Sequence, residues 1–332
     1  MSFKVGINGF GRIGRMIFRS IAERSELEVV AINDLTDGKT LGHLLKYDSV
    51  HGPFDGSIES GENDIYVDGK KIKIFSEKIP KKLPWQKLGV DVVVESTGFF
   101  VDGDKAAEHL SAGAKKVLIT APAKNVDATI VLGVNDHLLK SSHRIISNAS
   151  CTTNCLAPMA SVLHKNFNVL RGCMTTIHAY TSDQQIIDYP HSDLRRSRSG
   201  AVSMIPTITG AAKAIGEVIP GLEGRLNGMA VRVPVPNVSM VDFVAQVEQT
   251  PTVDEVNQVF SKVAEGKLKG IIEYCDDPIV SVDLVHNAAS CIFDSQITMI
   301  VDDGLVKICG WYDNEWGYSN RCVDLIERFS EI

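Results

Sequence analysis

The residue best placed for covalent chemistry is Cys151, in the sequence SCTTNC at positions 150–155, where a helix is predicted to begin. Free N–H groups and the positive end of the helix dipole stabilise a thiolate at this position. Cys155 lies one turn further on, and for it a buried, inert thiol is the favoured interpretation. A nucleophilic thiol needs a base, and His178, at the end of a predicted strand, is the candidate. Its imidazole could take the thiol proton and later move protons on a substrate oxygen.

A second chemical signal is the glycine pattern GFGRIG at positions 9–14, which follows one predicted strand and opens a predicted helix. In that context the glycines allow a tight turn, close approach of a pyrophosphate to the backbone, and close packing of the helix on the sheet. Asp34 follows the next predicted strand, where a carboxylate accepts from a ribose 2′-OH and repels a 2′-phosphate. The pattern therefore predicts an NAD site rather than an NADP site. Its residues are Gly9, Phe10, Gly11, Arg12, Ile13, Gly14 and Asp34.

A dinucleotide and a thiolate in one chain suggest acyl chemistry coupled to hydride transfer, and a phosphorylated substrate would need cationic, hydroxyl-rich sites. The sequences RRSR (195–198) and TITG (207–210) are two such clusters. Arg232 lies alone in an apolar predicted strand, where burial is costly unless an anion pairs with the guanidinium. Arg232 is therefore a better ligand candidate than Arg195 or Arg198, for which a solvated loop or a subunit interface is the favoured interpretation.

The elements that must position these residues differ between the two halves of the chain. A length of 332 residues predicts two domains. The first half alternates apolar strands with helices of 3.6-residue period, which predicts a parallel sheet with helices on both faces. Its predicted strands are 3–8, 27–32, 90–95, 116–120, 130–133 and 144–147, and its predicted helices are 12–23, 40–47 and 102–111.

Longer strands and fewer helices follow, which predict a largely antiparallel or mixed sheet with one covered face. The predicted strands are 171–179, 229–235, 242–249 and 306–312, and the predicted helices are 151–165, 253–264 and 317–329. Residues 181–206 show little periodicity, and so long a loop is usually functional or part of an interface.

Charge and composition exclude several classes of protein. The formal net charge of −7 gives no basic footprint for nucleic acid or an anionic membrane. No apolar run approaches the ~20 residues that span a bilayer. Seven cysteines without a CxxC pair indicate neither a disulfide framework nor a zinc site, and we expect no metal. The N-terminus shows no secretion signal, so we expect a cytoplasmic location.

Five motifs, taken together, resemble those of the phosphorylating glyceraldehyde-3-phosphate dehydrogenases. They are INGFGRIGR (7–15), SCTTNC (150–155), HAYT (178–181), TGAAK (209–213) and WYDNEWGYS (311–319). The resemblance covers nearly the whole chain. It implies a Rossmann-type, parallel-sheet NAD domain of residues 1–149 and 315–332. It also implies an α+β catalytic domain of residues 150–314 with a mostly antiparallel sheet, and a homotetramer in which the 181–206 loop lines a neighbour's cofactor site.

The same resemblance implies the reaction. Cys151 as thiolate attacks the aldehyde of glyceraldehyde 3-phosphate, and His178 acts as acid and base on the hemithioacetal. Hydride passes to NAD, and inorganic phosphate then attacks the thioester on Cys151 and releases 1,3-bisphosphoglycerate. The oxyanion would be stabilised by the Cys151 N–H and His178.

Further site residues follow only from the resemblance. Thr181 and Arg232 match the site for the substrate's phosphate. The inorganic-phosphate site is matched by Ser150, Thr152, Arg196, Thr209 and Gly210. Lys78, Thr120, Asn314 and Tyr318 match positions at the cofactor.

Two departures from the family pattern are Lys78, where many relatives have arginine, and Tyr189-Pro190, where many bacterial NAD-type relatives have Leu-Pro. Two alternatives remain at this point. One is the related erythrose-4-phosphate dehydrogenase, and the other is a nucleotide-binding regulator or surface adhesin that has lost catalysis.

Overall fold

The computed structural model describes residues 2–24 and 26–332. They form two compact units, each of which is described by itself. The first contains the described residues up to Ile130 together with His137–Ala149 and Ser319–Ile332, and the second contains Val131–Asp136 and Ser150–Tyr318.

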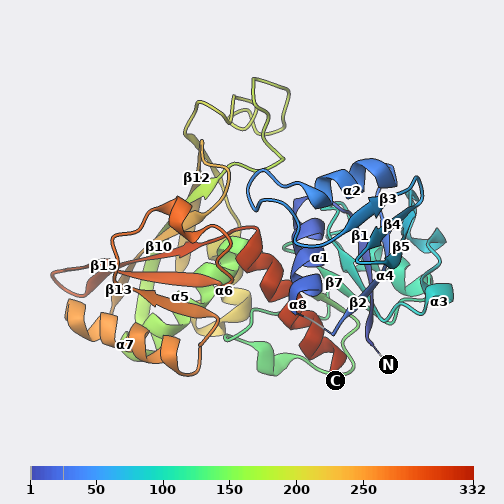
Figure 1. Ribbon diagram of the computed structural model, residues 1–332. Helices are drawn as coiled ribbons and strands as arrows, with labels where there is room; N and C mark the ends of the chain where they lie inside the picture. Colours follow the sequence, from blue (N-terminus) through green and yellow to red (C-terminus); the bar gives the residue numbers. More distant parts are fainter. Residues whose placement is uncertain (1, 25) are drawn as a thin grey trace. The chain divides into compact units, whose positions relative to one another are not determined.

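The first unit is built on a sheet of nine strands in the order β3-β4-β5-β2-β1-β6-β7-β9-β8 (Figure 1). Its central strand β1 (Lys4–Asn8) pairs in parallel with β2 (Glu28–Asn33) on one side and β6 (Val92–Glu95) on the other. Beyond β6 the parallel pairing continues through β7 (Lys116–Ile119), β9 (Ile145–Ser147) and β8 (Ala128–Thr129). Beyond β2 lie β5 (Lys70–Phe75), parallel to β2, and the antiparallel strands β4 (Asp64–Val67) and β3 (Ile58–Ser60).

Helices connect these strands and cover the sheet. They are α1 (Arg12–Arg24), α2 (Gly38–Lys46), α3 (Trp85–Leu88), α4 (Gly103–Ser111) and the last helix α8 (Trp316–Ser330). The side chain of Ser20 on α1 donates to Asn320 on α8 at 3.0 Å, which joins these two helices on one side of the sheet. Helix α1 connects β1 to β2 and α4 connects β6 to β7, and these two connections cross the sheet in opposite directions. Because such crossovers are right-handed, α1 and α4 lie on opposite faces of the sheet.

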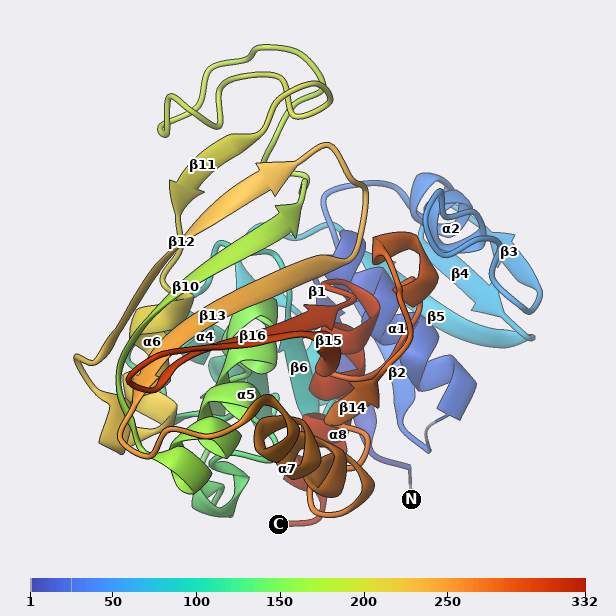
Figure 2. The same ribbon diagram turned by 90° about the vertical axis from the view of Figure 1, so that its left-hand side faces the viewer.

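The second unit is built on a sheet of seven strands, which lie side by side in Figure 2. In spatial order they are β11 (Ile205–Ile208), β12 (Leu226–Val233), β10 (Val169–Ala179), β13 (Ser239–Val247), β16 (Leu305–Tyr312), β15 (Cys291–Val301) and β14 (Ile272–Cys275). Four strand pairs are antiparallel, while β10 with β12 and β14 with β15 are parallel. The predicted fold class, a parallel-rich sheet followed by a mostly antiparallel one, is confirmed.

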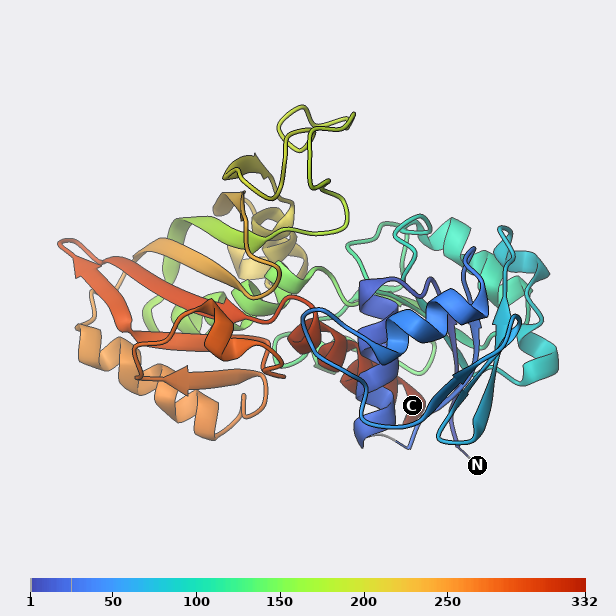
Figure 3. The same ribbon diagram turned by 45° about the horizontal axis from the view of Figure 1, so that its top comes forward.

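Helices α5 (Cys151–Phe167), α6 (Ala211–Val218) and α7 (Val253–Glu265) pack against this second sheet. Along β13 buried and partly exposed residues alternate without a break, as expected for a sheet with one covered face. Residues 180–204 form turns and irregular backbone, and this loop extends beyond β11 and β12 (Figure 3). The predicted irregular segment is thus confirmed up to residue 204, after which β11 begins.

The predicted strand at 130–133 is wrong. In the structure the strand is shorter and earlier, at Ala128–Thr129, and a turn follows. The N–H of Val131 donates to the side chain of Asn135 at 2.8 Å, and Gly133 has a φ of +79°. The apolar run is buried without being a strand, because a side-chain oxygen takes the hydrogen bond that a neighbouring strand would have made.

Several elements were not predicted at all: β3, β4, β5, β11, β14, β15, α3 and α6. Short 3₁₀ turns complete the chain at Pro80–Lys82, Asp136–Leu138, Pro220–Leu222 and Ser281–Leu284. Among the described residues no helix is both long and apolar enough to cross a bilayer.

Candidate active site

Cys151 is the first residue of α5, as the sequence predicts. The preceding residue, Ser150, has extended backbone, and its hydroxyl accepts from the N–H of Thr153 at 3.0 Å. This is an N-cap, which fixes where the helix begins. The cap therefore places the thiol of Cys151 in the first turn, where backbone N–H groups have no helical partners.

The imidazole of His178 lies beside this thiol. The Sγ atom of Cys151 and Nε2 of His178 are 3.5 Å apart. His178 is buried near the end of β10, and its register partner on the parallel strand β12 is Arg232. The two predicted catalytic residues are thus within contact distance, although they are separated by 27 positions in the sequence.

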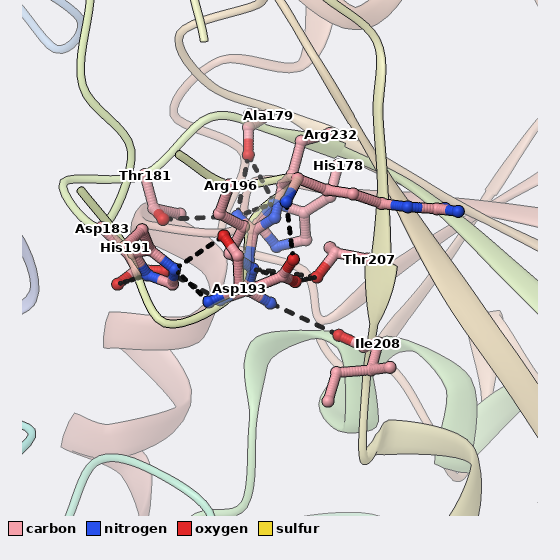
Figure 4. Close-up of polar contacts among 11 residues, drawn as sticks. His178, Ala179, Thr181, Asp183, His191, Asp193, Arg196, Thr207, Ile208 and Arg232 are labelled. Atoms are coloured by element: carbon pink, nitrogen blue, oxygen red, sulfur yellow. Dashed lines mark hydrogen bonds and ion pairs between the residues drawn. The ribbon is translucent and has the colours of Figure 1, made fainter. Parts of the chain in front are cut away.

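Arg232 contacts the other side of the same imidazole (Figure 4). Its Nη1 lies 3.0 Å from Nδ1 of His178, 3.1 Å from the carbonyl oxygen of Ala179 and 3.4 Å from Oγ1 of Thr181. The two residues predicted to bind the substrate's phosphate, Arg232 and Thr181, therefore lie together next to the predicted base. Among the described residues Nε of Arg232 is buried without a hydrogen-bond partner. A buried donor of this kind favours an anionic ligand.

Burial governs the protonation states of Cys151 and His178. It raises the pKa of the Cys151 thiol, which the charge of Arg232 and the N–H of Thr152 lower in part. Burial, and after it the charge of Arg232, lowers the pKa of His178 to about 3. Position at a helix N-terminus alone predicts a stabilised thiolate, but in the structure desolvation outweighs that effect. The thiol therefore keeps its proton, and the imidazole is neutral and free to accept it.

Tyr312 was not recognised from the sequence as part of this site. Its hydroxyl lies 2.9 Å from Oγ1 of Thr152 and 2.9 Å from Oγ1 of Thr176, and its ring meets His178 edge-on at 6.0 Å. Burial raises the pKa of Tyr312 well above its usual value, so the phenol stays protonated. The hydroxyl of Thr152 is thus engaged with Tyr312, while the residue's backbone flanks Cys151.

Arg196 is held by hydrogen bonds to a carboxylate, a hydroxyl and a carbonyl (Figure 4). Its Nη1 donates to Asp183 at 2.7 Å, its Nε donates to Oγ1 of Thr207 at 2.9 Å, and its Nη2 donates to the carbonyl of Ile208 at 3.3 Å. Thr207 in turn donates to Asp193 at 2.6 Å. Arg196 thereby lies beside the chain segment that leads into Thr209 and Gly210, the other predicted residues of the inorganic-phosphate site.

The remaining predicted residues of the second unit have separate environments. Oγ1 of Thr209 accepts from the N–H of Ala211 at 3.2 Å, and Gly210 directly precedes α6. Asn314 is buried, and its Oδ1 accepts from Ser239 at 2.8 Å. Ser239 also accepts from the N–H of Ala179, next to His178, at 3.1 Å. Tyr318 is buried at the start of α8.

A cavity of about 390 Å³ lies in the first unit where the carboxyl ends of β1, β2 and β6 meet. Four predicted cofactor residues line it: Gly9, Gly11, Asp34 and Lys78. Its other lining residues, which the sequence analysis did not single out, are Asn8, Asn33, Leu35, Glu77, Pro80, Ser96, Thr97, Phe99 and Phe100. Parallel sheets bind nucleotides at this edge.

Besides Asn314 and Tyr318 of the second unit, five predicted cofactor residues of the first unit do not line this cavity. Phe10 packs against Phe18, and its N–H donates to Asp34 at 2.7 Å. Arg12 forms an ion pair with Asp48. Ile13 and Gly14 belong to α1, and Thr120 hydrogen-bonds to the carbonyl of Glu95.

The three glycines of the motif have different surroundings. A Cβ on Gly14 would lie 2.2 Å from the carbonyl oxygen of Gly9, so only glycine lets α1 pack this closely. Gly9 has a φ of +92°, which favours glycine. A Cβ on Gly11 would meet no atom within 4 Å. The space in front of Gly11 fits the close approach of a pyrophosphate, so these residues are suited to hold a dinucleotide.

Comparison with known proteins decides the family. Residues 3–103 match the model described as glyceraldehyde 3-phosphate dehydrogenase, NAD binding domain, and residues 150–314 match the C-terminal domain of the same enzyme. The chain belongs to the glyceraldehyde-3-phosphate dehydrogenase family. The predicted family is therefore confirmed, as is NAD as the cofactor of the first domain.

Relatives in this family are similar over nearly their full length. The glyceraldehyde-3-phosphate dehydrogenase of Geobacillus stearothermophilus is 57% identical over 326 residues, which cover 98% of this chain and 97% of that protein. Glyceraldehyde-3-phosphate dehydrogenase 1 of Bacillus cereus is 56% identical, with 97% of each chain covered. That of Borreliella burgdorferi is 55% identical and covers 98% and 99%.

The first prediction concerns Gly11. Gly11→Ala should fold normally, since its Cβ meets no protein atom, but should weaken NAD binding by about tenfold or more by blocking the backbone. Calorimetric titration with NAD measures this. Gly61→Ala, with only an ordinary 3.4 Å contact in the same unit, is the control and should bind as the wild type does. Equal affinities for all three proteins would remove Gly11 from the cofactor site.

The second prediction concerns acid stability. Between pH 6.5 and about 3 the folded state keeps His178 neutral, whereas the unfolded chain binds a proton there. The unfolded state then holds more protons, so the free energy of unfolding falls as the pH falls through this window. His178→Asn should lose less stability than the wild type between pH 7 and pH 5 in urea unfolding. Identical losses would contradict the neutral, buried imidazole.

Proposed function

We propose that the protein catalyses the oxidation and phosphorylation of glyceraldehyde 3-phosphate. The reaction converts glyceraldehyde 3-phosphate, inorganic phosphate and NAD into 1,3-bisphosphoglycerate and NADH. The observation that carries the proposal is the 3.5 Å approach of the Cys151 thiol to His178, with Arg232 on the far side of the same imidazole. Relatives at 55–57% identity bear the glyceraldehyde enzyme's name, so erythrose 4-phosphate is not retained as the preferred substrate.

In the first half-reaction Nε2 of His178 takes the proton of the Cys151 thiol, and the thiolate sulfur attacks the aldehyde carbon. The oxyanion that forms is stabilised by the N–H of Cys151 and by the protonated imidazole, which then donates its proton to the oxygen to give a neutral hemithioacetal. Bound NAD supplies a hydride acceptor. As the hemithioacetal carbon loses hydride, His178 takes back the hydroxyl proton, and a thioester remains on Cys151.

In the second half-reaction an oxygen of inorganic phosphate attacks the thioester carbon. The carbon–sulfur bond breaks, the acyl phosphate leaves, and the proton of the attacking hydrogen phosphate passes to solvent. The protonated His178 returns its proton to the sulfur of Cys151, which restores the thiol beside a neutral imidazole. Each step uses the same sulfur and the same imidazole, which the N-cap of α5 and the end of β10 hold in fixed positions.

We assign the anion sites on charge and position. Arg232 and Thr181 would hold the substrate's own phosphate, and Arg196 with Ser150, Thr152, Thr209 and Gly210 would hold inorganic phosphate. A phosphate beside Arg232 offsets the positive charge that lowers the pKa of His178. Binding of the substrate therefore makes proton transfer from Cys151 to His178 easier.

The cofactor assignments also remain proposals. Gly9, Gly11, Asp34 and Lys78 would hold the adenosine and phosphate groups, with Phe10, Arg12, Ile13, Gly14 and Thr120 shaping their surroundings. Asn314 and Tyr318 would serve the nicotinamide. In this assignment residues 1–149 and 315–332 form the cofactor-binding domain, and residues 150–314 carry the catalytic groups and contribute Asn314 to the cofactor site.

We further propose a homotetramer in the cytoplasm. The loop of residues 180–204 supports assembly, because it presents large apolar side chains to solvent, which marks a surface for another chain. Its most exposed examples are Ile186, Ile187, Leu194, Val202 and Met204, each 75–80% exposed. Light scattering measures the number of chains.

The third prediction tests the reaction. Cys151→Ser should reduce phosphate-dependent NADH formation by roughly a thousandfold or more, because the thioester can no longer form. NAD binding should be unchanged. Absorbance of NADH with and without inorganic phosphate is the assay, and Cys155→Ser, one helical turn away, is the matched control that should keep most activity. NADH formation by Cys151→Ser at the wild-type rate, or wild-type NADH formation that does not depend on inorganic phosphate, would overturn the proposed reaction.

A further inference from the structure

A buried carboxylate, Glu95, lies at the carboxyl end of β6, next to the dinucleotide cavity. It is 2% exposed and follows three buried valines on the same strand. Its Oε1 accepts from the N–H of Thr97 at 2.9 Å and from the Thr97 hydroxyl. Its Oε2 accepts from Nδ2 of Asn8 at 2.6 Å and contacts Nε2 of His109 at 3.0 Å. Burying a charge among apolar neighbours is costly, so this position needs an explanation beyond packing.

The protonation of His109 follows from its other neighbour. The indole N–H of Trp85, which can only donate, lies 3.0 Å from Nδ1 of His109. Nδ1 must therefore accept, and the proton of the imidazole is on Nε2, from which it points at Glu95. All three side chains are buried. Glu95 thus receives four donors, and a carboxylate is the group that can accept all four.

From Glu95 the hydrogen bonds continue into the lining of the cavity. Oδ1 of Asn8, whose amide is held by Glu95, accepts from Nδ2 of Asn33 at 2.7 Å. Asn33 then holds the backbone of Glu77 twice, accepting from its N–H at 2.8 Å and donating to its carbonyl at 2.9 Å. Four members of this network, Asn8, Asn33, Glu77 and Thr97, line the cavity.

The ends of the network adjoin two proposed cofactor residues. Asn33 directly precedes Asp34, and Glu77 directly precedes Lys78. One carboxylate therefore fixes the backbone beside both polar groups that would face the adenosine ribose.

We propose that Glu95 is a positioning residue of the dinucleotide site, and that His109, whose tautomer Trp85 fixes, holds it as the acceptor of four hydrogen bonds. The proposal rests on the proposed function for the identity of the ligand as NAD. If the network had only a structural role, it would stabilise the sheet, and disrupting it would leave the affinity of the cavity for NAD unchanged.

Glu95→Gln tests the proposal, because it keeps the shape but turns one acceptor into a donor that faces donors. We expect KM for NAD to rise about tenfold, and the inhibition constant of ADP-ribose, a probe of the adenosine half, to rise equally. At saturating NAD, kcat should stay within about twofold of the wild type, since Cys151 and His178 are untouched. The fraction of Cys151 that iodoacetamide alkylates measures what proportion of the active sites remains intact in the variant.

Ser20→Ala is the matched control. Its buried hydroxyl bonds Asn320 in the same unit and does not line the cavity, so this variant should lose stability with KM for NAD unchanged. A Glu95→Gln protein with lowered stability but wild-type KM and ADP-ribose inhibition would overturn the proposal.

Trp85→Phe carries the test if Glu95→Gln does not fold. It removes the donor that fixes the tautomer of His109 and keeps an aromatic ring in the buried core, and KM for NAD should rise by about two- to fivefold with kcat retained. An unchanged KM in that variant would overturn the proposal. Wild-type protein that binds no NAD would instead overturn the proposed function and this inference with it, so the two failures are distinguishable.

Discussion

The contact between Arg232 and the imidazole of His178 is the constraint on which the catalytic unit depends. It exists because β10 and β12 run parallel with these two residues as register partners. A shift of one residue in that register would turn one of the two side chains to the other face of the sheet. The same strand end leads into Ala179 and Thr181, whose oxygens share the guanidinium. A single strand pairing therefore brings together the proposed base, the proposed phosphate-binding cation and its hydroxyl partner.

The dinucleotide unit depends on a different kind of constraint, which is the absence of side-chain atoms. Gly14 lets α1 touch the turn at Gly9, and Gly11 leaves the backbone open. Behind this surface, polar groups replace the apolar side chains usual in a parallel sheet, with Glu95, Asn8 and Asn33 ending neighbouring strands. The apolar core begins at the residues that precede these polar groups on their strands. On β6, Val93 and Val94 come directly before Glu95 and are fully buried.

Much of the fold could be predicted from local patterns. The glycine motif with its flanking strand and helix, and the start of α5 at Cys151, have signals that span only a few residues. Of the strands in two hairpins, β4, β5 and β15 were missed and only β16 was predicted, although each hairpin carried a signal at its turn. Asp68-Gly69 joins β4 to β5, Asp303-Gly304 joins β15 to β16, and all four residues have positive φ. Such Asp-Gly pairs favour tight hairpin turns.

The site was less accessible to sequence reasoning, because its geometry comes from contacts between distant residues. Motifs indicated Cys151, His178 and Arg232, but nothing local to Tyr312 indicates that its hydroxyl lies between two threonines more than 130 positions away. Likewise, helix position alone predicts a stabilised thiolate, and only the assembled structure shows how strongly burial opposes it. The wrong prediction of a strand at 130–133 also comes from reasoning without distant contacts. Hydrophobic residues indicate burial, but they do not specify which group accepts the hydrogen bonds of their backbone N–H groups.

The two arginines of the catalytic unit differ in how far their charge is already balanced. Hydrogen bonds from Arg196 and His191 lower the pKa of Asp183, although burial raises it, so Arg196 faces an ionised carboxylate at 2.7 Å. Among the described residues Arg232 forms no ion pair with a carboxylate, and its nearest partners, His178, Ala179 and Thr181, are neutral. An anion arriving at Arg196 must share the guanidinium with Asp183, whereas one at Arg232 does not. In the proposed assignment, inorganic phosphate at Arg196 would therefore exchange more readily than the substrate's phosphate at Arg232, an order that suits a reagent entering after an acyl group is already anchored.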